Sequence, residues 1–140
     1  MKIDVTFLER CVLTLENALF LMQKSNPDNI EYDMYRSVCI KEFEIILEQC
    51  GKLLRKVLNP YFHTSKAVDK LTFKQVFKNA VLRDLLNVEE YERWLIYRDN
   101  RINTAHDYGE NFAKETLVIL PQFIIDSNAL IEIIKNNNTN

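Results

Sequence analysis

Residues 32–58 read YDMYRSVCIKEFEIILEQCGKLLRKVL, and this stretch decides the fold class. Apolar side chains return along it every three or four positions, which places them on one side of an α-helix and the charged residues on the other. The apolar stripe consists of Tyr35, Val38, Cys39, Phe43, Ile46, Leu47, Cys50, Leu53, Leu54 and Val57. We therefore predict one long helix over this stretch, ended by Asn59-Pro60.

The same periodicity predicts further helices on both sides of this stretch. A first helix is expected from Asp4, whose side chain can cap it, to about Lys24, where a polar turn containing Pro27 ends it. Thr72, with Gln75 three positions later, is a capping-box signature that opens a third helix. Both helices carry a single apolar stripe, so we expect them to pack against residues 32–58.

Two more helices are predicted in the second half of the chain. Asn87 is expected to cap a fourth helix, whose acidic first turn suits the helix dipole and which ends near Gly109. A last helix is expected from about Glu110 to Lys135, with a kink at Pro121. Long antiparallel helices joined by short loops describe an all-α, up-and-down bundle of four or five helices.

The composition of the chain fits a single globular domain. Its 140 residues lie within the usual size of one domain, with 47% hydrophobic and 27% charged residues. Only two glycines and three prolines are present, which leaves little material for the turns of an all-β fold. We expect residues 1–135 to form one helical domain and residues 136–140 to form a disordered tail.

Sequence features that report on location and redox state favour a cytoplasmic protein. No basic-then-apolar leader follows Met1, and no run of about 18 uncharged apolar residues is present, so we expect no contact with a membrane. Cys11, Cys39 and Cys50 are odd in number, form no C-x-x-C pair and lie among apolar helix positions. They are interpreted as buried, reduced thiols.

The charge of the chain is distributed unevenly. The net charge is only −2, which argues against a general nucleic-acid-binding protein. However, residues 52–83 contain eight Lys or Arg and one acid, Asp69, so this segment carries +7 and the remainder of the chain −9. The segment is either a solvated helix face opposite acidic neighbours or a patch that meets phosphates or an acidic partner.

Most classes of catalytic and metal site are excluded by the residues present. There is no glycine-rich phosphate loop, no H-E-x-x-H and no cysteine pair with zinc-ligand spacing, and only two histidines occur. We therefore expect neither a metal nor a cofactor. His63 follows a proline turn and is interpreted as a surface loop residue.

The stretch Arg101-Ile102-Asn103-Thr104-Ala105-His106-Asp107-Tyr108 carries the chemical specificity of the chain. An arginine supplies fixed positive charge for a phosphate, and a histidine moves protons near neutral pH. Metal-independent RNA cleavage needs a base, an acid and a cation. Because one chain offers a single histidine here, a two-fold dimer is needed to complete the set.

Two structural interpretations of the same stretch stay open at the level of the residues. Arg101 can pair with Asp107 or Glu110 near the end of a helix, while His106 caps that helix. Tyr108 can be an aromatic residue packed at the helix exit. Spacings of the Arg-x4-His kind also arise by chance, so the spacing does not decide between these interpretations and a site.

The context of this stretch resembles the HEPN domain, and more narrowly its nucleotidyltransferase substrate-binding, HepT-like branch. Residues 104–110, Thr-Ala-His-Asp-Tyr-Gly-Glu, are similar to the Thr-Ser-His-x-Tyr-x-Glu of that branch. The likeness extends from the first helix to Lys135. It also includes Phe43-Glu44, Lys52-Leu53-Leu54, Thr72-Phe73-Lys74-Gln75-Val76, Trp94-Leu95 and Pro121.

The resemblance implies a toxin of a toxin–antitoxin pair. Arg101 and His106 would be the pair that cleaves RNA, facing their counterparts across a homodimer. Tyr108 would be the position at which a small nucleotidyltransferase antitoxin, encoded by an adjacent gene, attaches AMP and silences the nuclease. The candidate supporting residues around the pair are Arg98, Asn100, Asn103 and Asp107.

One departure from the family pattern keeps two functions open. The family usually places Asn, Asp or His directly after the arginine, whereas this sequence has the apolar Ile102 there. A nuclease would need Asn103 or Asn100 to replace that polar contact. The alternative is a non-catalytic subunit that uses its helical cleft, together with residues 52–83, to dock a small nucleotidyltransferase.

Overall fold

Helix α2 is the spine of the structure, and each of the other helices packs against it. The computed structural model describes residues 2–106 and 110–138, with the backbone alone for residues 102–106 and 110–113. Within these residues there are six α-helices and one 3-10 turn, and no strand. The elements are α1 (Thr6–Lys24), α2 (Ile30–Leu58), η1 (Asn59–Tyr61), α3 (Ser65–Asp69), α4 (Phe73–Leu82), α5 (Val88–His106) and α6 (Glu110–Asn136).

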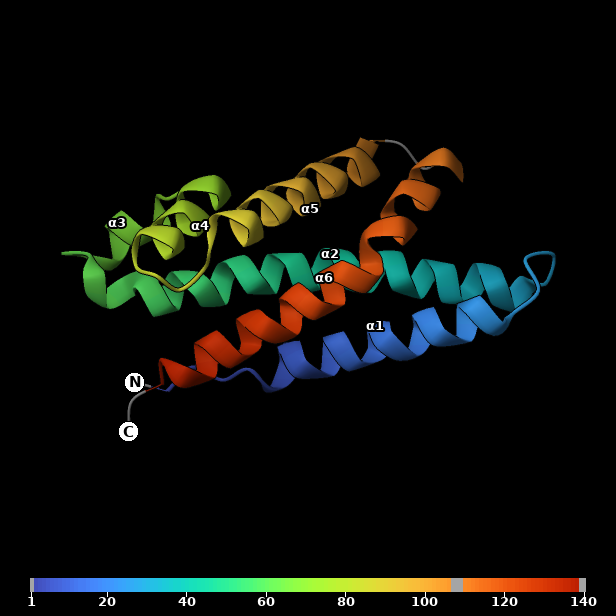
Figure 1. Ribbon diagram of the computed structural model, residues 1–140, viewed down its shortest axis with the longest axis horizontal. Helices are drawn as coiled ribbons and strands as arrows, with labels where there is room; N and C mark the ends of the chain where they lie inside the picture. Colours follow the sequence, from blue (N-terminus) through green and yellow to red (C-terminus); the bar gives the residue numbers. More distant parts are fainter. Residues whose placement is uncertain (1, 107–109, 139–140) are drawn as a thin grey trace.

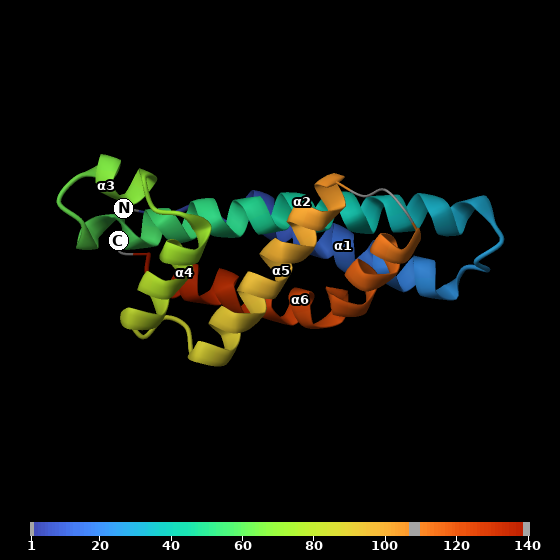
Figure 2. The same cartoon turned by 90° about the horizontal axis from the view of Figure 1, so that it is seen from above.

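The long helices run up and down along one axis. Helices α1 and α2 lie side by side and antiparallel. Helix α5 runs back along α2 from the end where α4 lies, and α6 then crosses α2 and ends beside α1 near the N-terminus (Figures 1 and 2). The short helices α3 and α4 gather at the end of the bundle where α2 finishes. The predicted all-α, up-and-down architecture is therefore confirmed.

The observed helix boundaries differ little from the predicted ones, with one addition. Asp4 accepts a hydrogen bond from the backbone N–H of Thr6 at 2.9 Å, so its side chain satisfies the first N–H of a helix that begins at Thr6. Helix α2 begins at Ile30, slightly earlier than its apolar stripe. Helix α3, capped by Thr64, was not predicted, because five residues are too few to show a periodic pattern.

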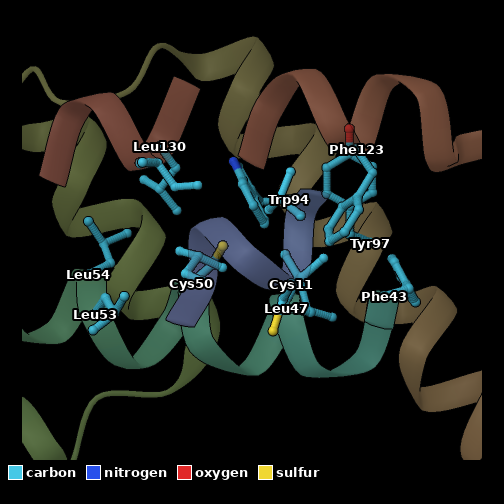
Figure 3. Close-up of a cluster of buried hydrophobic side chains, with 14 of the residues drawn as sticks. Cys11, Phe43, Leu47, Cys50, Leu53, Leu54, Trp94, Tyr97, Phe123 and Leu130 are labelled. Atoms are coloured by element: carbon cyan, nitrogen blue, oxygen red, sulfur yellow. The ribbon is translucent and has the colours of Figure 1, made fainter. Parts of the chain in front are cut away.

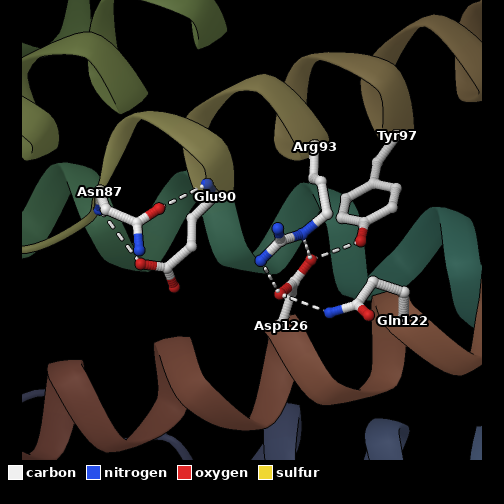
Figure 4. A network of polar contacts seen from close by, with 6 residues as sticks. All are labelled: Asn87, Glu90, Arg93, Tyr97, Gln122 and Asp126. Atoms are coloured by element: carbon white, nitrogen blue, oxygen red, sulfur yellow. Dashed lines mark hydrogen bonds and ion pairs between the residues drawn. The ribbon is translucent and has the colours of Figure 1, made fainter.

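Reciprocal caps fix the starts of α4 and α5. Thr72 accepts from the backbone N–H of Gln75 at 3.2 Å, and Gln75 accepts from that of Thr72 at 2.8 Å. Asn87 and Glu90 exchange the same pair of bonds at 2.8 and 3.1 Å (Figure 4). Between the two helices, Asp84 adopts a left-handed conformation with φ of 59°. Both predicted caps are thus confirmed.

Helix α6 bends, and it buries polar as well as apolar residues in the bundle. Pro121 lies inside α6, as predicted, and Figure 1 shows the helix changing direction along its length. An 18-residue stretch within residues 114–136 has a mean hydropathy of 1.7, so the helix could span a membrane by length and composition alone. However, α6 packs against α1, α2 and α5 and buries Asp126 and Ser127, so we identify it as a core helix.

The centre of the core is a group of aromatic rings contributed by four helices. Trp94 of α5 is fully buried and stacks on Phe77 of α4, with 5.0 Å between ring centroids. Phe123 of α6 makes edge contacts with Phe43 of α2 at 4.7 Å and with Tyr97 of α5 at 4.9 Å. Figure 3 shows Trp94, Tyr97 and Phe123 above Leu47, Cys50, Leu53 and Leu54 of α2. The aromatic group fixes α4, α5 and α6 on the spine.

The three cysteines are buried free thiols, which confirms their interpretation from the sequence. Burial raises the pKa of Cys11 and of Cys39 to about 11 each, and Glu42 adds to the effect at Cys11. Burial also raises the pKa of Cys50. All three therefore stay protonated at neutral pH and lack the thiolate needed for reaction.

We expect these thiols to react with iodoacetamide at pH 8 about a hundredfold more slowly in the folded protein than in denaturant, because of their low thiolate fraction. Mass spectrometry of timed samples, with and without guanidinium, measures the difference. Alkylation of any one cysteine at its denatured rate in plain buffer would contradict the burial described above.

The C-terminal segment differs from the predicted disordered tail. Helix α6 extends through Asn136, and the side chain of Asn138 is held by the N-terminal segment. Its Oδ1 accepts from the backbone N–H of Ile3 at 2.7 Å, and its Nδ2 donates to the Ile3 carbonyl at 3.1 Å. The prediction of disorder is wrong for residues 136–138. The polar composition of this segment gives no sign that Asn138 forms two hydrogen bonds with the backbone of Ile3. Residues 139–140 lie outside the described part.

Candidate functional site

Three arginines from two helices line one pocket. Arg98 and Arg101 lie one turn apart on α5, and Arg55 of α2 joins them across a cavity of about 310 Å³. We call this cavity, which also contacts Phe73 of α4, the arginine pocket. Its remaining lining residues are Leu47, Glu48 and Gly51 of α2. The three guanidinium groups outnumber the single carboxylate, so the pocket is positively charged.

A glycine in the middle of α2 lies at the floor of this pocket. Gly51 is buried, and a Cβ atom built there would lie 3.4 Å from Cδ2 of Phe73 and 3.8 Å from Nη1 of Arg55, which are ordinary van der Waals contacts. Glycine inside a helix costs about 1 kcal/mol relative to alanine. At residue 51 it lets Phe73 and Arg55 lie close to the backbone of α2.

Arg55 and Phe73 are held in place by neighbouring groups. Nη2 of Arg55 donates a hydrogen bond to the carbonyl of Leu71 at 3.0 Å, next to the capped start of α4. Nε of Arg55 is buried and has no hydrogen-bond partner among the described residues. Phe73 packs on Phe77 with centroids 4.5 Å apart, and the guanidinium carbon of Arg98 lies 6.0 Å from its ring.

Arg55 also borders a second cavity, of about 270 Å³, toward α3. We call it the lysine pocket, since Lys52 and Lys56 of α2 line it together with the polar residues Asn59, Ser65 and Asp69. The predicted basic segment, residues 52–83, therefore lines the whole of the lysine pocket and contributes Arg55 and Phe73 to the arginine pocket. Its lysines on α3 and α4 are exposed.

Part of the predicted site falls within the described residues. Arg101 and Arg98 both line the arginine pocket, whereas Asn100 donates its Nδ2 to the carbonyl of Ile96 at 3.1 Å. His106 is the last residue of α5. The side chains of His106, Asn103 and Ile102, and all of Asp107 and Tyr108, lie outside the described residues, so the pairing of Arg101 with His106 stays a prediction.

A buried polar cluster between α5 and α6 was not predicted from the sequence. Arg93 donates two hydrogen bonds to the carboxylate of Asp126, at 2.8 and 2.9 Å. Tyr97 donates to Oδ2 of the same carboxylate, and Gln122 donates to Oδ1 at 3.2 Å (Figure 4). Asp126 is only 3% exposed, so this Asp126 cluster satisfies a charge inside the bundle.

The hydrogen bonds of the Asp126 cluster control the ionisation of its members. Burial by itself raises the pKa of Asp126, but the hydrogen bonds from Arg93, Tyr97 and Gln122 outweigh it, and the pKa lies below the ordinary 3.8. Burial and the bond to Asp126 raise the pKa of Tyr97. Asp126 is therefore an anion and Tyr97 a neutral donor at neutral pH.

The sequence contained a signal for this cluster. Asp126 is an acid in the middle of an otherwise apolar stretch of the last helix, and such a residue requires a partner if that face is buried. Arg93 and Tyr97, four positions apart on one helix, offer two donors to a single point. The pattern does not identify the partner, because the choice depends on how α5 crosses α6.

The chemistry of the pocket is anion binding. Planar guanidinium groups match the oxygens of phosphate, and they cannot act as bases because they stay protonated. Proton transfer near this site would need His106, since the other histidine, His63, is exposed in the loop before α3, as predicted. No group of three His, Cys, Asp or Glu that could hold a metal ion occurs in the part of the chain that is described.

Comparison with protein families gives one match along almost the whole chain. A family model described as "nucleotidyltransferase substrate binding protein like" matches residues 4–136. This range includes all six α-helices and the whole stretch from Arg101 to Tyr108.

Individual relatives agree with this match. A protein of Haemophilus influenzae described as a probable ribonuclease HepT is 23% identical over 141 residues, covering 98% of this chain and 95% of that protein. A solved H. influenzae structure, reported as the fold of a substrate-binding domain of a nucleotidyltransferase, gives a TM-score of 0.80 at 21% identity and covers 94% and 98% of the two chains. A crystal structure of a Thermus thermophilus protein gives a TM-score of 0.72 at 25% identity, with 91% and 98% covered.

Proposed function

Because this chain belongs to the family of nucleotidyltransferase substrate-binding-like proteins, we propose that it is a cytoplasmic, metal-independent endoribonuclease of the HepT type, silenced by a partner nucleotidyltransferase. One observation carries the proposal. Arg101, the arginine of the predicted nuclease pair, lines a pocket that holds two further arginines. A site that meets RNA needs such a concentration of fixed positive charge.

The reaction requires two proton transfers at one phosphate. In the proposed mechanism, a His106 side chain removes the proton of a ribose 2′-hydroxyl, whose oxygen attacks the adjacent phosphorus. The bond from phosphorus to the 5′-oxygen breaks, and a second histidine returns a proton to that oxygen. The products carry a 2′,3′-cyclic phosphate and a 5′-hydroxyl. Arg101 stabilises the extra negative charge on the phosphorane.

The second histidine is the reason to propose a homodimer. One chain offers one histidine in the Arg101–Tyr108 stretch, so His106 of a second copy would provide the acid. Two-fold symmetry would bring the two α5 ends together and place both arginine pockets at one cleft. Light scattering of the purified protein measures this assembly, and a monomer that still cleaves RNA would contradict it.

The regulatory part of the proposal concerns Tyr108. The hydroxyl oxygen of Tyr108 would attack the α-phosphorus of ATP on the partner nucleotidyltransferase and release pyrophosphate. The AMP so attached would add a negative phosphate two residues from His106, where it would compete with RNA for the arginines. The family description supports a nucleotidyltransferase as partner, and we expect an adjacent gene to encode it.

The experiment that tests the proposal uses total RNA. We expect the purified protein to cleave RNA in the presence of EDTA and to leave 5′-hydroxyl ends. Prior incubation with the partner and ATP is expected to abolish cleavage and to add the mass of AMP to the peptide that contains Tyr108. Intact RNA after incubation with the unmodified protein would contradict the nuclease, and an unmodified Tyr108 would contradict the regulation.

A second function is favoured by two observations on the sequence. Ile102 follows Arg101 where the family usually has a polar residue, and from residue 89 to 115 seven acids face four Arg or Lys. Both weaken the case for strong RNA binding. The alternative is a non-catalytic subunit that holds the substrate of a small nucleotidyltransferase. In that case the protein would bind its partner tightly while leaving RNA intact.

A further inference from the structure

We propose that the arginine pocket is a subsite that binds one nucleotide of single-stranded RNA, next to the phosphate that Arg101 contacts. Arg55 and Arg98 bind the phosphate of this nucleotide, and the ring of Phe73 forms the wall against its base or ribose. The inference rests on the proposed function in one respect, which is that the nucleotide belongs to the RNA substrate. The pocket itself is defined by described residues alone.

The charge of the pocket fits a phosphate. Three arginines line it against a single acid, Glu48, and Arg98 makes no ion pair within the described part of the chain. By contrast, Arg93 on the same helix is neutralised by Asp126. Arg55 likewise makes no ion pair within the described residues, and two like charges held near each other without a bound anion repel each other. The arrangement therefore selects an anionic ligand with several oxygens.

Arg55 supplies a second, independent indication. Its Nη2 is fixed by the carbonyl of Leu71, but its Nε is buried without a partner among the described residues. A buried donor on a charged group that lacks a hydrogen bond destabilises the unbound protein. A shift of the guanidinium group toward a phosphate in the pocket would give that donor an acceptor.

The shape of the pocket fits one nucleotide. Its volume of about 310 Å³ lies at the small end of ligand sites, which span roughly 300–1,000 Å³. Phe73 packs close to α2 over Gly51, is braced by Phe77, and offers an aromatic surface beside the arginines. Aromatic rings next to basic residues are the usual receptors for single-stranded bases.

The neighbouring lysine pocket gives the strand a path to follow. Arg55 borders both cavities, and Lys52 and Lys56 continue the positive charge along α2 away from Arg101. A chain of phosphates can therefore run from the proposed cleavage site over α2 toward α3. This continuity favours a nucleotide within a strand over a free mononucleotide.

The test measures binding with a strand that cannot be cleaved. The probe is a fluorescein-labelled, single-stranded oligoribonucleotide with 2′-O-methyl groups, titrated with full-length protein and followed by fluorescence anisotropy at several salt concentrations. Two changes disable the pocket: Arg55→Gln with Arg98→Gln removes two charges, and Gly51→Leu fills the floor while leaving all charges in place. Gly51→Ala and Arg10→Gln, which alters an exposed arginine on α1, are the matched controls.

We expect the double arginine variant to bind the probe at least about tenfold more weakly, with the slope of log affinity against log salt reduced by about 1.4. Gly51→Leu should lose a similar factor, although its net charge is that of the wild type. Gly51→Ala and Arg10→Gln should bind like the wild type. Free AMP should compete poorly, because it lacks the neighbouring phosphates that contact the lysine pocket.

Several results would overturn the inference. The first is that the wild-type protein does not bind the probe. The second and third are that Gly51→Leu keeps wild-type affinity, or that Arg10→Gln loses as much affinity as the pocket variants. The fourth is that binding of AMP depends on the pocket while binding of RNA does not. Thermal melts check that each variant folds, and the double arginine variant decides the question if Gly51→Leu is unfolded. Pocket-dependent binding without cleavage of natural RNA would refute the proposed nuclease alone, whereas cleavage unaffected by both pocket variants would refute the subsite alone.

Discussion

RNA cleavage by the His106→Ala variant is expected to fall about a thousandfold below that of the wild type. The physical reason is that a positioned acid or base contributes roughly 10²–10⁴ to such a reaction, and a symmetric dimer would lose both groups at once. Initial rates on a labelled oligoribonucleotide measure the effect. Arg101→Ala should lose about 10²–10³, because it removes the cation at the phosphorane rather than the proton transfer.

These variants have a matched control and a clear contrary result. Arg10→Ala removes an arginine of the same type from the exposed face of α1, and should cleave at the wild-type rate. Equal melting temperatures would show that the losses are chemical rather than structural. Wild-type cleavage by His106→Ala would remove His106 from the mechanism and with it the proposed use of the Arg101–Tyr108 stretch.

The Asp126→Ala variant is expected to lower the free energy of unfolding by about 3 kcal/mol. Breaking a buried ion pair costs roughly 3–5 kcal/mol, and the loss is at the lower end here because the side chain of Arg93 is 35% exposed and can recover water. The buried hydroxyl of Tyr97 loses its acceptor as well. Urea titration followed by circular dichroism measures the change.

An acid on the solvent side of the same helix provides the control. Glu132 is exposed and contacts Lys135 at 3.7 Å, so Glu132→Ala should change stability by less than about 0.5 kcal/mol. If Asp126→Ala proved no more destabilising than Glu132→Ala, the Asp126 cluster would not be formed in solution.

The same cluster predicts how stability depends on pH. Because the pKa of folded Asp126 lies below its unfolded value, its contribution is fully present above about pH 4 and is lost as the pH falls through the folded pKa. Asp126→Asn, which cannot ionise, should lack this component, so its stability should decline less steeply below pH 4. Parallel acid-induced decline in both proteins would show that other carboxylates dominate.

The main helices were predictable because their signals are local. The stripe along α2 and the caps at Thr72 and Asn87 involve residues three or four positions apart. The structure confirms both caps and buries the stripe from Cys39 onward, whereas Val38, which was predicted to belong to it, is exposed. The five residues of α3 and the clamp between Ile3 and Asn138 were not predicted. A single helical turn is too short for a periodic pattern, and a contact between distant residues leaves no mark on either segment.

The candidate site was likewise predictable only where its residues are close together in the sequence. Arg101 was found from a short motif, and Arg98 was named beside it, because both belong to one stretch of α5. Arg55, Gly51 and Phe73 come from other helices, and they join the site only through the crossing of α2, α4 and α5. The basic segment of residues 52–83 indicated that phosphate binding was possible there, but it did not connect that charge with the motif.

The paired hydrogen bonds from Arg93 to Asp126 set the rotation of α5 about its own axis. A planar fork on a carboxylate favours one orientation, so rotation of α5 against α6 would strain these two bonds. Arg98 and Arg101 lie farther along the same rigid rod, and any roll would swing both guanidinium groups out of alignment together. The cluster therefore restrains the rotation of α5 and so orients the two arginines that α5 contributes to the pocket. Arg93 and Asp126 do this without touching a ligand in that pocket.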